Sequence, residues 1–258
     1  MLTDRELDEC AEVVDLLARY AIERIVADRP RADQIGTKTN DADWVTETDV
    51  AVERHVRDEL RARFPRDTIV GEELGSSEVA ESRASWYVDP VDGTTNFVHG
   101  LPWSSFSIAV CDESGPAVGA VADPYRREIL SAIRGRGARR NSEPTRCSDT
   151  RTLVGGIFLT ELSMQSLWRG QATLMESLAG AGCVTRIMGS NALSLASVGA
   201  GRALATIVDF NLVDGQAGTL VARESGADVR FEGKGVLAAA PGVADELAHL
   251  WHEARNGH

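Results

Sequence analysis

Lysine is almost absent from this 258-residue chain, since only Lys38 and Lys234 interrupt an otherwise all-arginine set of 27 basic residues. Positive charge as a whole is scarce, because 39 acidic residues leave a formal net charge of -12. A chain of this charge repels nucleic-acid phosphates and anionic lipid head groups, so we expect neither nucleic acid nor a membrane as its main partner. The scarcity of lysine also makes Lys38 and Lys234 candidates for roles that arginine cannot fill.

Long apolar runs and a signal peptide are also missing. No apolar stretch reaches the roughly 20 residues that a membrane-spanning helix needs. Residues 1–12 are rich in charge and lack the apolar core of a secretory signal. The four cysteines lie far apart, which is typical of neither a disulfide framework nor a zinc site. We therefore expect a cytoplasmic protein with reduced thiols.

Hydrophobic periodicity predicts a mixed α/β protein. A capping-box pattern at Thr3 and Glu6 opens a helix that extends to about Ile25, and a second helix is expected from Thr48 to about Leu60. Strands are expected in the first half at residues 68–70, 86–88, 106–111, 117–122 and 128–132. In the second half we expect strands at 153–159, 184–187, 203–208 and 236–239, alternating with helices at 163–178, 191–198, 214–224 and 244–254.

The chain is expected to form one domain, residues 1–258. A basic, turn-rich stretch at residues 136–147 predicts a boundary between an N-terminal lobe of about 1–140 and a C-terminal lobe of about 141–258.

Carboxylates stand where apolar segments end. Glu72 follows a short strand that stops at a glycine, Asp89 and Asp92 follow another strand, and Asp214 opens a helix of small residues. Pro90 stops the strand ladder between the two aspartates, which lie close enough in sequence to ligate neighbouring cations. Oxygen ligands of this kind suit Mg²⁺, and two such cations facing a phosphate are typical of two-metal hydrolysis.

Each of these carboxylates alone has an ordinary structural explanation. Asp-Pro and Asp-Gly are common turn dipeptides, paired glutamates are common on solvated surfaces, and an aspartate such as Asp214 is a good helix N-cap. The conjunction of several carboxylates at strand and helix ends is what favours a metal site.

One of these segments is similar to a family signature. It is the run Asp89-Pro90-Val91-Asp92-Gly93-Thr94-Thr95-Asn96-Phe97, which resembles the signature of the inositol monophosphatase family. Gly71-Glu72-Glu73 resembles the glutamate motif of that family, and Lys38 with Asp49 resembles its lysine-bearing loop. Looser matches follow near Gly189 and Asp214. The resemblance covers essentially the whole chain in the family's order. It implies a layered α/β/α/β/α sandwich of the inositol monophosphatase and fructose bisphosphatase type, two or three Mg²⁺ ions and a homodimer.

The resemblance also implies residue roles. It implies that Glu72, Asp89 and the Val91 carbonyl hold one Mg²⁺, and that Asp89, Asp92 and Asp214 hold a second. Glu72 and Thr94 are implied to orient and activate the attacking water, while Lys38 and Asp49 are implied to belong to a catalytic loop that closes over the metals. The residues implied to bind substrate are Asp92, Gly93, Thr94, Thr95, Gly189, Ser190, Asn191, Asp209 and Asp214.

The implied reaction is hydrolysis of a small phosphate monoester, with inositol 1-phosphate or a related cyclitol phosphate as the leading substrate. The segment before Asp214 is shorter than usual in the family, Val213 replaces a tryptophan, and Asn191 stands where alanine is commoner. Asp209 is then the nearest candidate for the family's substrate-contacting glutamate. Two alternatives stay open: a histidinol-phosphate phosphatase on the same fold, and a non-catalytic regulatory member of the family.

Overall fold

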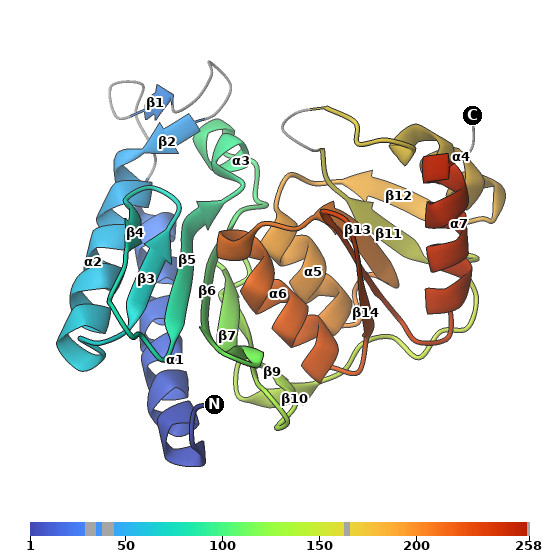
Figure 1. The fold of residues 1–258 in the computed structure, drawn as a ribbon. Helices are drawn as coiled ribbons and strands as arrows, with labels where there is room; N and C mark the ends of the chain where they lie inside the picture. Colours follow the sequence, from blue (N-terminus) through green and yellow to red (C-terminus); the bar gives the residue numbers. More distant parts are fainter. Residues whose placement is uncertain (29–34, 38–43, 163–165, 257–258) are drawn as a thin grey trace.

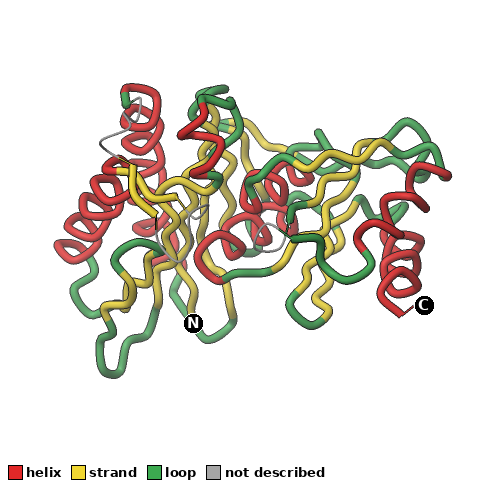
Figure 2. Tube along the Cα trace, turned by 90° about the horizontal axis from the view of Figure 1, so that it is seen from above, coloured by secondary structure: helices red, strands yellow, loops and turns green. Residues whose placement is uncertain are grey.

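The computed structural model describes residues 1–28, 35–37, 44–162 and 166–256. It confirms the predicted fold class, because three layers of helices alternate with two large sheets (Figure 1). From one side to the other, the layers are α1 with α2, an eight-stranded sheet, α5 with α6, a five-stranded sheet, and α4 with α7. The view from above keeps this order (Figure 2). No helix in the described part of the chain is long and apolar enough to span a bilayer.

The first helical layer starts from two capping boxes. Helix α1 (Asp4–Ala27) is capped by Thr3, whose side chain accepts from the Glu6 amide while Glu6 bonds back. Helix α2 (Glu47–Arg63) is capped in the same way by Thr46 and Asp49, and it begins one residue before the predicted start. Both helices bury an apolar stripe against the eight-stranded sheet.

The eight-stranded sheet is mostly antiparallel. Its order is β10 (Glu143–Thr145), β9 (Ala138–Arg140), β8 (Glu128–Ile133), β7 (Gly115–Asp123), β6 (Ser105–Asp112), β5 (Ser85–Asp92), β3 (Thr68–Gly71) and β4 (Gly75–Ser77). Only β3 and β5 pair in parallel. Their carboxyl ends therefore meet at one edge, where a small hairpin of β1 (Ile35–Thr37) and β2 (Trp44–Thr46) and the short helix α3 (Thr94–His99) also lie (Figure 1).

Helices α5 (Asn191–Gly199) and α6 (Leu212–Glu224) are the middle layer and pack on both sheets. Small residues let them approach closely. A Cβ added to Gly119 of β7 would lie 3.1 Å from the Ala217 Cα of α6, and one added to Gly218 would lie 2.7 Å from the Leu195 Cβ of α5. The N-terminus of α6 is thereby held at the same end of the sheet as the end of β5.

The second sheet has the order β12 (Val184–Ile187), β11 (Ile157–Thr160), β13 (Ala205–Asp209), β15 (Gly235–Ala239) and β14 (Asp228–Glu232). Helices α4 (Gln171–Gly180) and α7 (Ala244–Asn256) cover its outer face. The predicted strand at 153–159 starts only at Ile157. The predicted helix at 163–178 starts at Gln171, and its first residues lie partly outside the described part of the chain.

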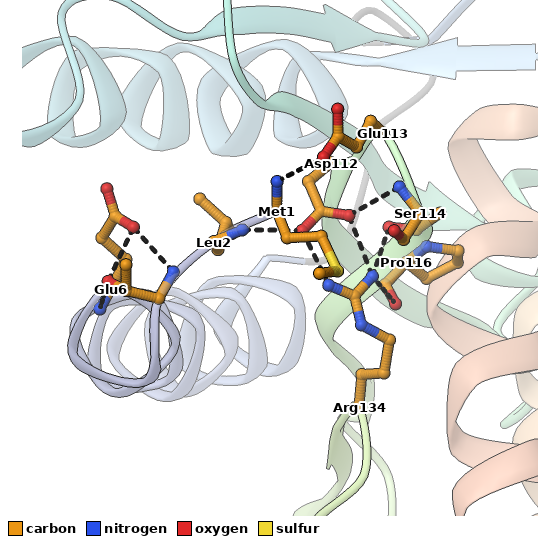
Figure 3. A network of polar contacts seen from close by, with 10 residues as sticks. Met1, Leu2, Glu6, Asp112, Glu113, Ser114, Pro116 and Arg134 are labelled. Atoms are coloured by element: carbon orange, nitrogen blue, oxygen red, sulfur yellow. Dashed lines mark hydrogen bonds and ion pairs between the residues drawn. The ribbon is translucent and has the colours of Figure 1, made fainter.

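At the opposite end of the first sheet, Asp112 ties the start of the chain to the β6–β7 turn (Figure 3). Its carboxylate accepts the amide hydrogens of Leu2 at 2.8 Å and Ser114 at 2.9 Å. Arg134 donates to both of its oxygens, at 2.9 and 2.7 Å. These bonds give Asp112 a purely structural set of partners, which makes it a useful contrast to the carboxylates described next.

Candidate active site

Three aspartates from two elements meet at the end of β5. Asp89 and Asp92 belong to β5, and Asp214 lies in the first turn of α6. One oxygen from each carboxylate lies within 4.8 Å of the other two, and such a group has the spacing of a metal site. The pairing of β5 with β6 shifts register between Asp89 and Asp92, around Pro90, which has no amide hydrogen for the ladder.

The electrostatics of this cluster are unfavourable without a cation. Burial, followed by the charges of Glu72, Asp92 and Asp214, holds the pKa of Asp89 well above its ordinary value. Burial and then the Asp92 charge raise the pKa of Asp214 in the same way. Burial raises the pKa of Asp92 to about 6, although hydrogen bonds from Ser190 and Ala192 oppose the rise.

The donor set fits a hard divalent cation. Asp214 Oδ1 is a buried oxygen without a hydrogen-bond partner among the described residues, while its Oδ2 accepts from the Asn191 amide at 3.2 Å. Asp92 Oδ2 is held by the Ser190 hydroxyl at 2.5 Å and by the Ala192 amide at 2.8 Å. A buried, unsatisfied carboxylate oxygen beside two further carboxylates is costly unless a cation or a proton lies there.

Glu72 lies close to this cluster, in a turn that Glu53 of α2 holds by hydrogen bonds. Its amide donates to the Val88 carbonyl at 3.1 Å, and its charge acts on all three aspartates. The buried Glu53 carboxylate accepts the next two amides, of Glu73 at 2.7 Å and Leu74 at 3.1 Å. A Cβ on Gly71 would lie 2.0 Å from Glu53 Oε1, so glycine is needed where the turn meets the helix.

Thr94 connects the cluster to the start of α2. Its hydroxyl lies 2.9 Å from the Val91 carbonyl and 3.5 Å from Asp49 Oδ1. Asp49 is fully buried, and its other oxygen accepts the Thr46 amide at 2.9 Å. The structure therefore brings together the predicted residues Asp49, Val91 and Thr94. Lys38 lies outside the described residues.

A cavity of about 350 Å³ opens beside these groups. Its wall consists of Trp44, Asp92, Gly93, Thr94, Thr95, Asn96, Glu161, Leu162, Ile187, Gly189 and Asn191. Gly93 has a φ of +86°, and a Cβ there would lie 2.7 Å from the Gly189 carbonyl oxygen. Only glycine therefore fits at this position of the turn. The predicted substrate residues Gly93, Thr94, Thr95, Gly189 and Asn191 all line this one cavity.

Asp92 lines this cavity too, and the other three predicted substrate residues do not: Asp214 lies in the acidic cluster, and Ser190 and Asp209 lie elsewhere. Ser190 is buried, caps α5 and bonds to Asp92, so it lies behind the cavity wall. Asp209 lies at the end of β13 and lines a separate cavity of about 80 Å³ together with Trp168 and Lys234. Besides Asp92, the main cavity is lined by a second acidic residue, Glu161, which follows β11 and was not predicted. Glu161 directly follows an apolar strand, as Glu72 does, and the same rule applied to β11 would have identified it.

Fold and site together define a class of protein: a five-layered α/β chain with buried acidic groups beside a cavity at the end of the sheet. A profile of the inositol monophosphatase family matches residues 6–256. The chain belongs to the inositol monophosphatase family.

Similar proteins support the membership. Nus factor SuhB of Pasteurella multocida is 36% identical over 242 residues, which span 89% of this chain and 91% of that protein. Nus factor SuhB of Pseudomonas aeruginosa is 38% identical over 81% of this chain and 80% of its own length. The solved structure of the Thermotoga maritima IMPase is 30% identical, with a TM-score of 0.84 over 98% of both chains. The extragenic suppressor protein SuhB from Bartonella henselae has a TM-score of 0.88 at 27% identity, over 96% of this chain and 98% of its own.

Proposed function

We propose that the chain is a Mg²⁺-dependent phosphatase that hydrolyses a small phosphate monoester, with inositol 1-phosphate or a related cyclitol phosphate as substrate. The observation that carries the proposal is the convergence of Asp89, Asp92 and Asp214, whose oxygens lie within 4.8 Å of one another beside a cavity. Buried carboxylates this close repel one another, and the unpaired Asp214 Oδ1 marks where a cation would relieve the repulsion.

In this proposal the cation ligands are the carboxylates of Glu72, Asp89, Asp92 and Asp214 and the carbonyl of Val91. Bound Mg²⁺ would supply positive charge to the phosphate oxygens and favour ionisation of the attacking water. The number of ions, two or three, is part of the proposal.

The remaining groups of the site act on the phosphate and the water. The Thr94 hydroxyl, fixed between Val91 and Asp49, is placed to orient the attacking water, and Glu72 is the carboxylate that can accept its proton. Gly93, Thr94 and Thr95 line the side of the cavity on which we place the phosphate. The water oxygen bonds to phosphorus as a proton passes to Glu72, and the bond from phosphorus to the alcohol oxygen breaks. The leaving alcohol oxygen takes up a proton from solvent, and Glu72 releases its proton to solvent.

The alcohol is assigned to the part of the cavity lined by Gly189 and Asn191. Asn191 brings a side-chain amide to this part of the cavity, and a site that hydrogen-bonds a hydroxyl group favours a hydroxylated alcohol. A histidinol-phosphate phosphatase is the alternative on the same site.

A second candidate function rests on the names of the relatives. Two of the three similar SuhB proteins are called Nus factors, which is not an enzyme name, so we keep a regulatory role for this chain as a second candidate. A cytoplasmic location, a homodimer and the absence of a nucleic-acid partner stay predictions.

A phosphate-release screen tests these candidates. The purified chain is assayed with Mg²⁺ on inositol 1-phosphate, histidinol phosphate, a sugar phosphate and a nucleotide. We expect the highest kcat/KM on the cyclitol phosphate. A preference for histidinol phosphate selects the alternative enzyme, and no release from any of the four favours the regulatory role.

A further inference from the structure

Glu161 is a buried carboxylate that no step above uses. Only 4% of its surface is exposed, and burial raises the pKa of its carboxyl to about 7. Both oxygens accept hydrogen bonds. Oε2 accepts the amide hydrogens of Met188, at 3.1 Å, and of Gly189, while Oε1 accepts from the Ser194 hydroxyl at 2.6 Å. With its oxygens occupied in this way, Glu161 acts on the turn at residues 188–189.

Asn96, on α3, holds the same turn by hydrogen bonds from its other side. Its side-chain amide donates to the Met188 carbonyl at 2.6 Å and to the Trp103 carbonyl at 2.7 Å. The peptide groups around Met188 are therefore bonded on their N–H side by a residue that follows β11 and on their C=O side by a residue of α3.

The turn at residues 188–189 lies against two parts of the site, Gly93 and Asp92. The Gly189 carbonyl lies so close to Gly93 that a Cβ there would approach it to 2.7 Å, so the turn is seated on the predicted phosphate cradle. Directly after the turn, Ser190 and Ala192 at the start of α5 bond to Asp92 Oδ2. A displacement of the turn would therefore move both Gly93 and the carboxylate of Asp92.

We propose that Glu161 and Asn96 are positioning residues, which clamp the turn at residues 188–189 and thereby set the orientation of Asp92 and Gly93. This inference rests on the proposed function, because it assigns the two side chains a task in the same metal and phosphate site. Residues that orient metal ligands from behind typically contribute about 10- to 100-fold to metal affinity or activity.

The chain offers an isosteric test of this clamp. In Glu161→Gln the amide oxygen can take the place of Oε2 and accept both backbone N–H groups, and the amide nitrogen can donate to the Ser194 oxygen. Glu161→Ala removes every one of these contacts. Holding the turn requires a side chain of the same shape with an oxygen that accepts the two backbone N–H groups, which glutamine provides. Proton transfer requires the carboxyl group itself, so the two variants separate these roles.

Glu224→Ala is the matched control. Glu224 also holds a turn, accepting the Gly135 amide at 2.8 Å and the Gly137 amide at 2.9 Å. It lies ten residues after Asp214 on α6, or about 15 Å at the helical rise of 1.5 Å per residue. Loss of this glutamate therefore tests the general cost of freeing a turn, away from the cluster.

Two readouts are measured for each variant: the dissociation constant for Mn²⁺ alone, by calorimetry, and Mg²⁺-dependent turnover of an aryl phosphate. For Glu161→Ala we expect metal affinity and kcat to fall by about 10-fold or more. Glu161→Gln and Glu224→Ala should stay within about twofold of wild type. Asn96→Ala should weaken Mn²⁺ binding in the same direction, and it carries the test if Glu161→Ala does not fold.

Three results overturn the inference. If Glu161→Ala, or in its place Asn96→Ala, binds Mn²⁺ and turns over like wild type, the clamp has no role in the site. If Glu161→Gln loses as much as Glu161→Ala, the carboxyl group itself is required. If wild type binds no Mn²⁺ and releases no phosphate, the proposed function fails together with the inference. Normal wild-type activity in the first two cases shows that only the inference has failed.

Discussion

Replacing Asp89 by asparagine separates a metal ligand from an ordinary buried aspartate. Asp89 is 3% exposed, and its Oδ1 accepts the Val91 amide at 3.0 Å, a bond that an asparagine oxygen can keep. Two unit charges 4.8 Å apart repel by about 3 kcal/mol at an effective dielectric constant of about 20. At pH 8, Asp89→Asn should therefore leave the metal-free chain as stable as wild type, or more stable by up to about 3 kcal/mol.

The same substitution should abolish the response to Mg²⁺. At a Mg²⁺ concentration of about 100 times its dissociation constant, wild type should gain about 2.7 kcal/mol in free energy of unfolding. Asp89→Asn should gain less than about 1 kcal/mol. Turnover should fall by at least about 1,000-fold, which corresponds to about 4 kcal/mol of transition-state stabilisation.

The assays are urea unfolding with and without Mg²⁺, and phosphate release from the best substrate of the screen. Asp112→Asn is the control: it removes a buried carboxylate at the other end of β5 and β6, where Arg134 compensates the charge. It should lower stability and leave Mg²⁺-dependent turnover intact. The reasoning is refuted if Asp89→Asn is destabilised as Asp112→Asn is while it keeps the Mg²⁺ response.

Three further outcomes are expected. Burial raises the pKa of Asp92 from 3.8 to about 6, and the pKa values of Asp89 and Asp214 are raised as well. The metal-free chain should therefore lose stability as the pH rises from 4 through 6. Unfolding from pH 4 to 8 measures this loss, and a saturating Mg²⁺ concentration should remove it. Arg134 holds the pKa of Asp112 well below its ordinary value, so Asp112 stabilises the fold above pH 4 and ceases to do so as the pH falls. Asp112→Asn should therefore lower the free energy of unfolding by about 2 kcal/mol at pH 7 and by much less at pH 2. An equal loss at both pH values would contradict this role of Asp112. Asn191→Ala should shift the relative kcat/KM among cyclitol, histidinol and sugar phosphates by about tenfold. Asp209 lines the other cavity, so Asp209→Ala should leave these ratios unchanged. If instead Asp209→Ala shifts them and Asn191→Ala does not, Asp209 belongs to the substrate site.

Local rules predicted most of the acidic cluster. Asp89, Asp92 and Asp214 each stand where an apolar element ends or begins, and the carboxyl ends of β3 and β5 meet because these two strands are parallel neighbours. The position of each of these residues therefore follows from its neighbours along the chain. The same holds for the caps at Thr3 and Thr46, which are patterns of four residues.

Features that depend on distant contacts were harder to predict. The helix expected from residue 163 begins only at Gln171, because Gly170 has a φ of +87° and a Cβ there would lie 2.3 Å from the Ala254 carbonyl oxygen of α7. Gly170 and Ala254 are far apart in the sequence, so no local pattern predicts that they lie this close.

One strand was missed, and one predicted substrate residue lies apart from the main cavity. Strand β14, with Val229 and Phe231 alternating with charged residues, has the pattern of a strand and was not predicted. The assignment of Asp209 rested on its distance from Asp214 along the chain, whereas the structure places it in a separate cavity and brings Glu161 to the main one.

The central claim is that these acidic groups form a metal-dependent hydrolytic site, and adding metal back to the stripped chain tests it most directly. The purified chain is treated with EDTA, dialysed, and assayed for phosphate release from inositol 1-phosphate and from an aryl phosphate. The account predicts no release until Mg²⁺ is added and many turnovers per chain afterwards. Equal turnover before and after Mg²⁺, or none on either substrate with Mg²⁺ present, would contradict it.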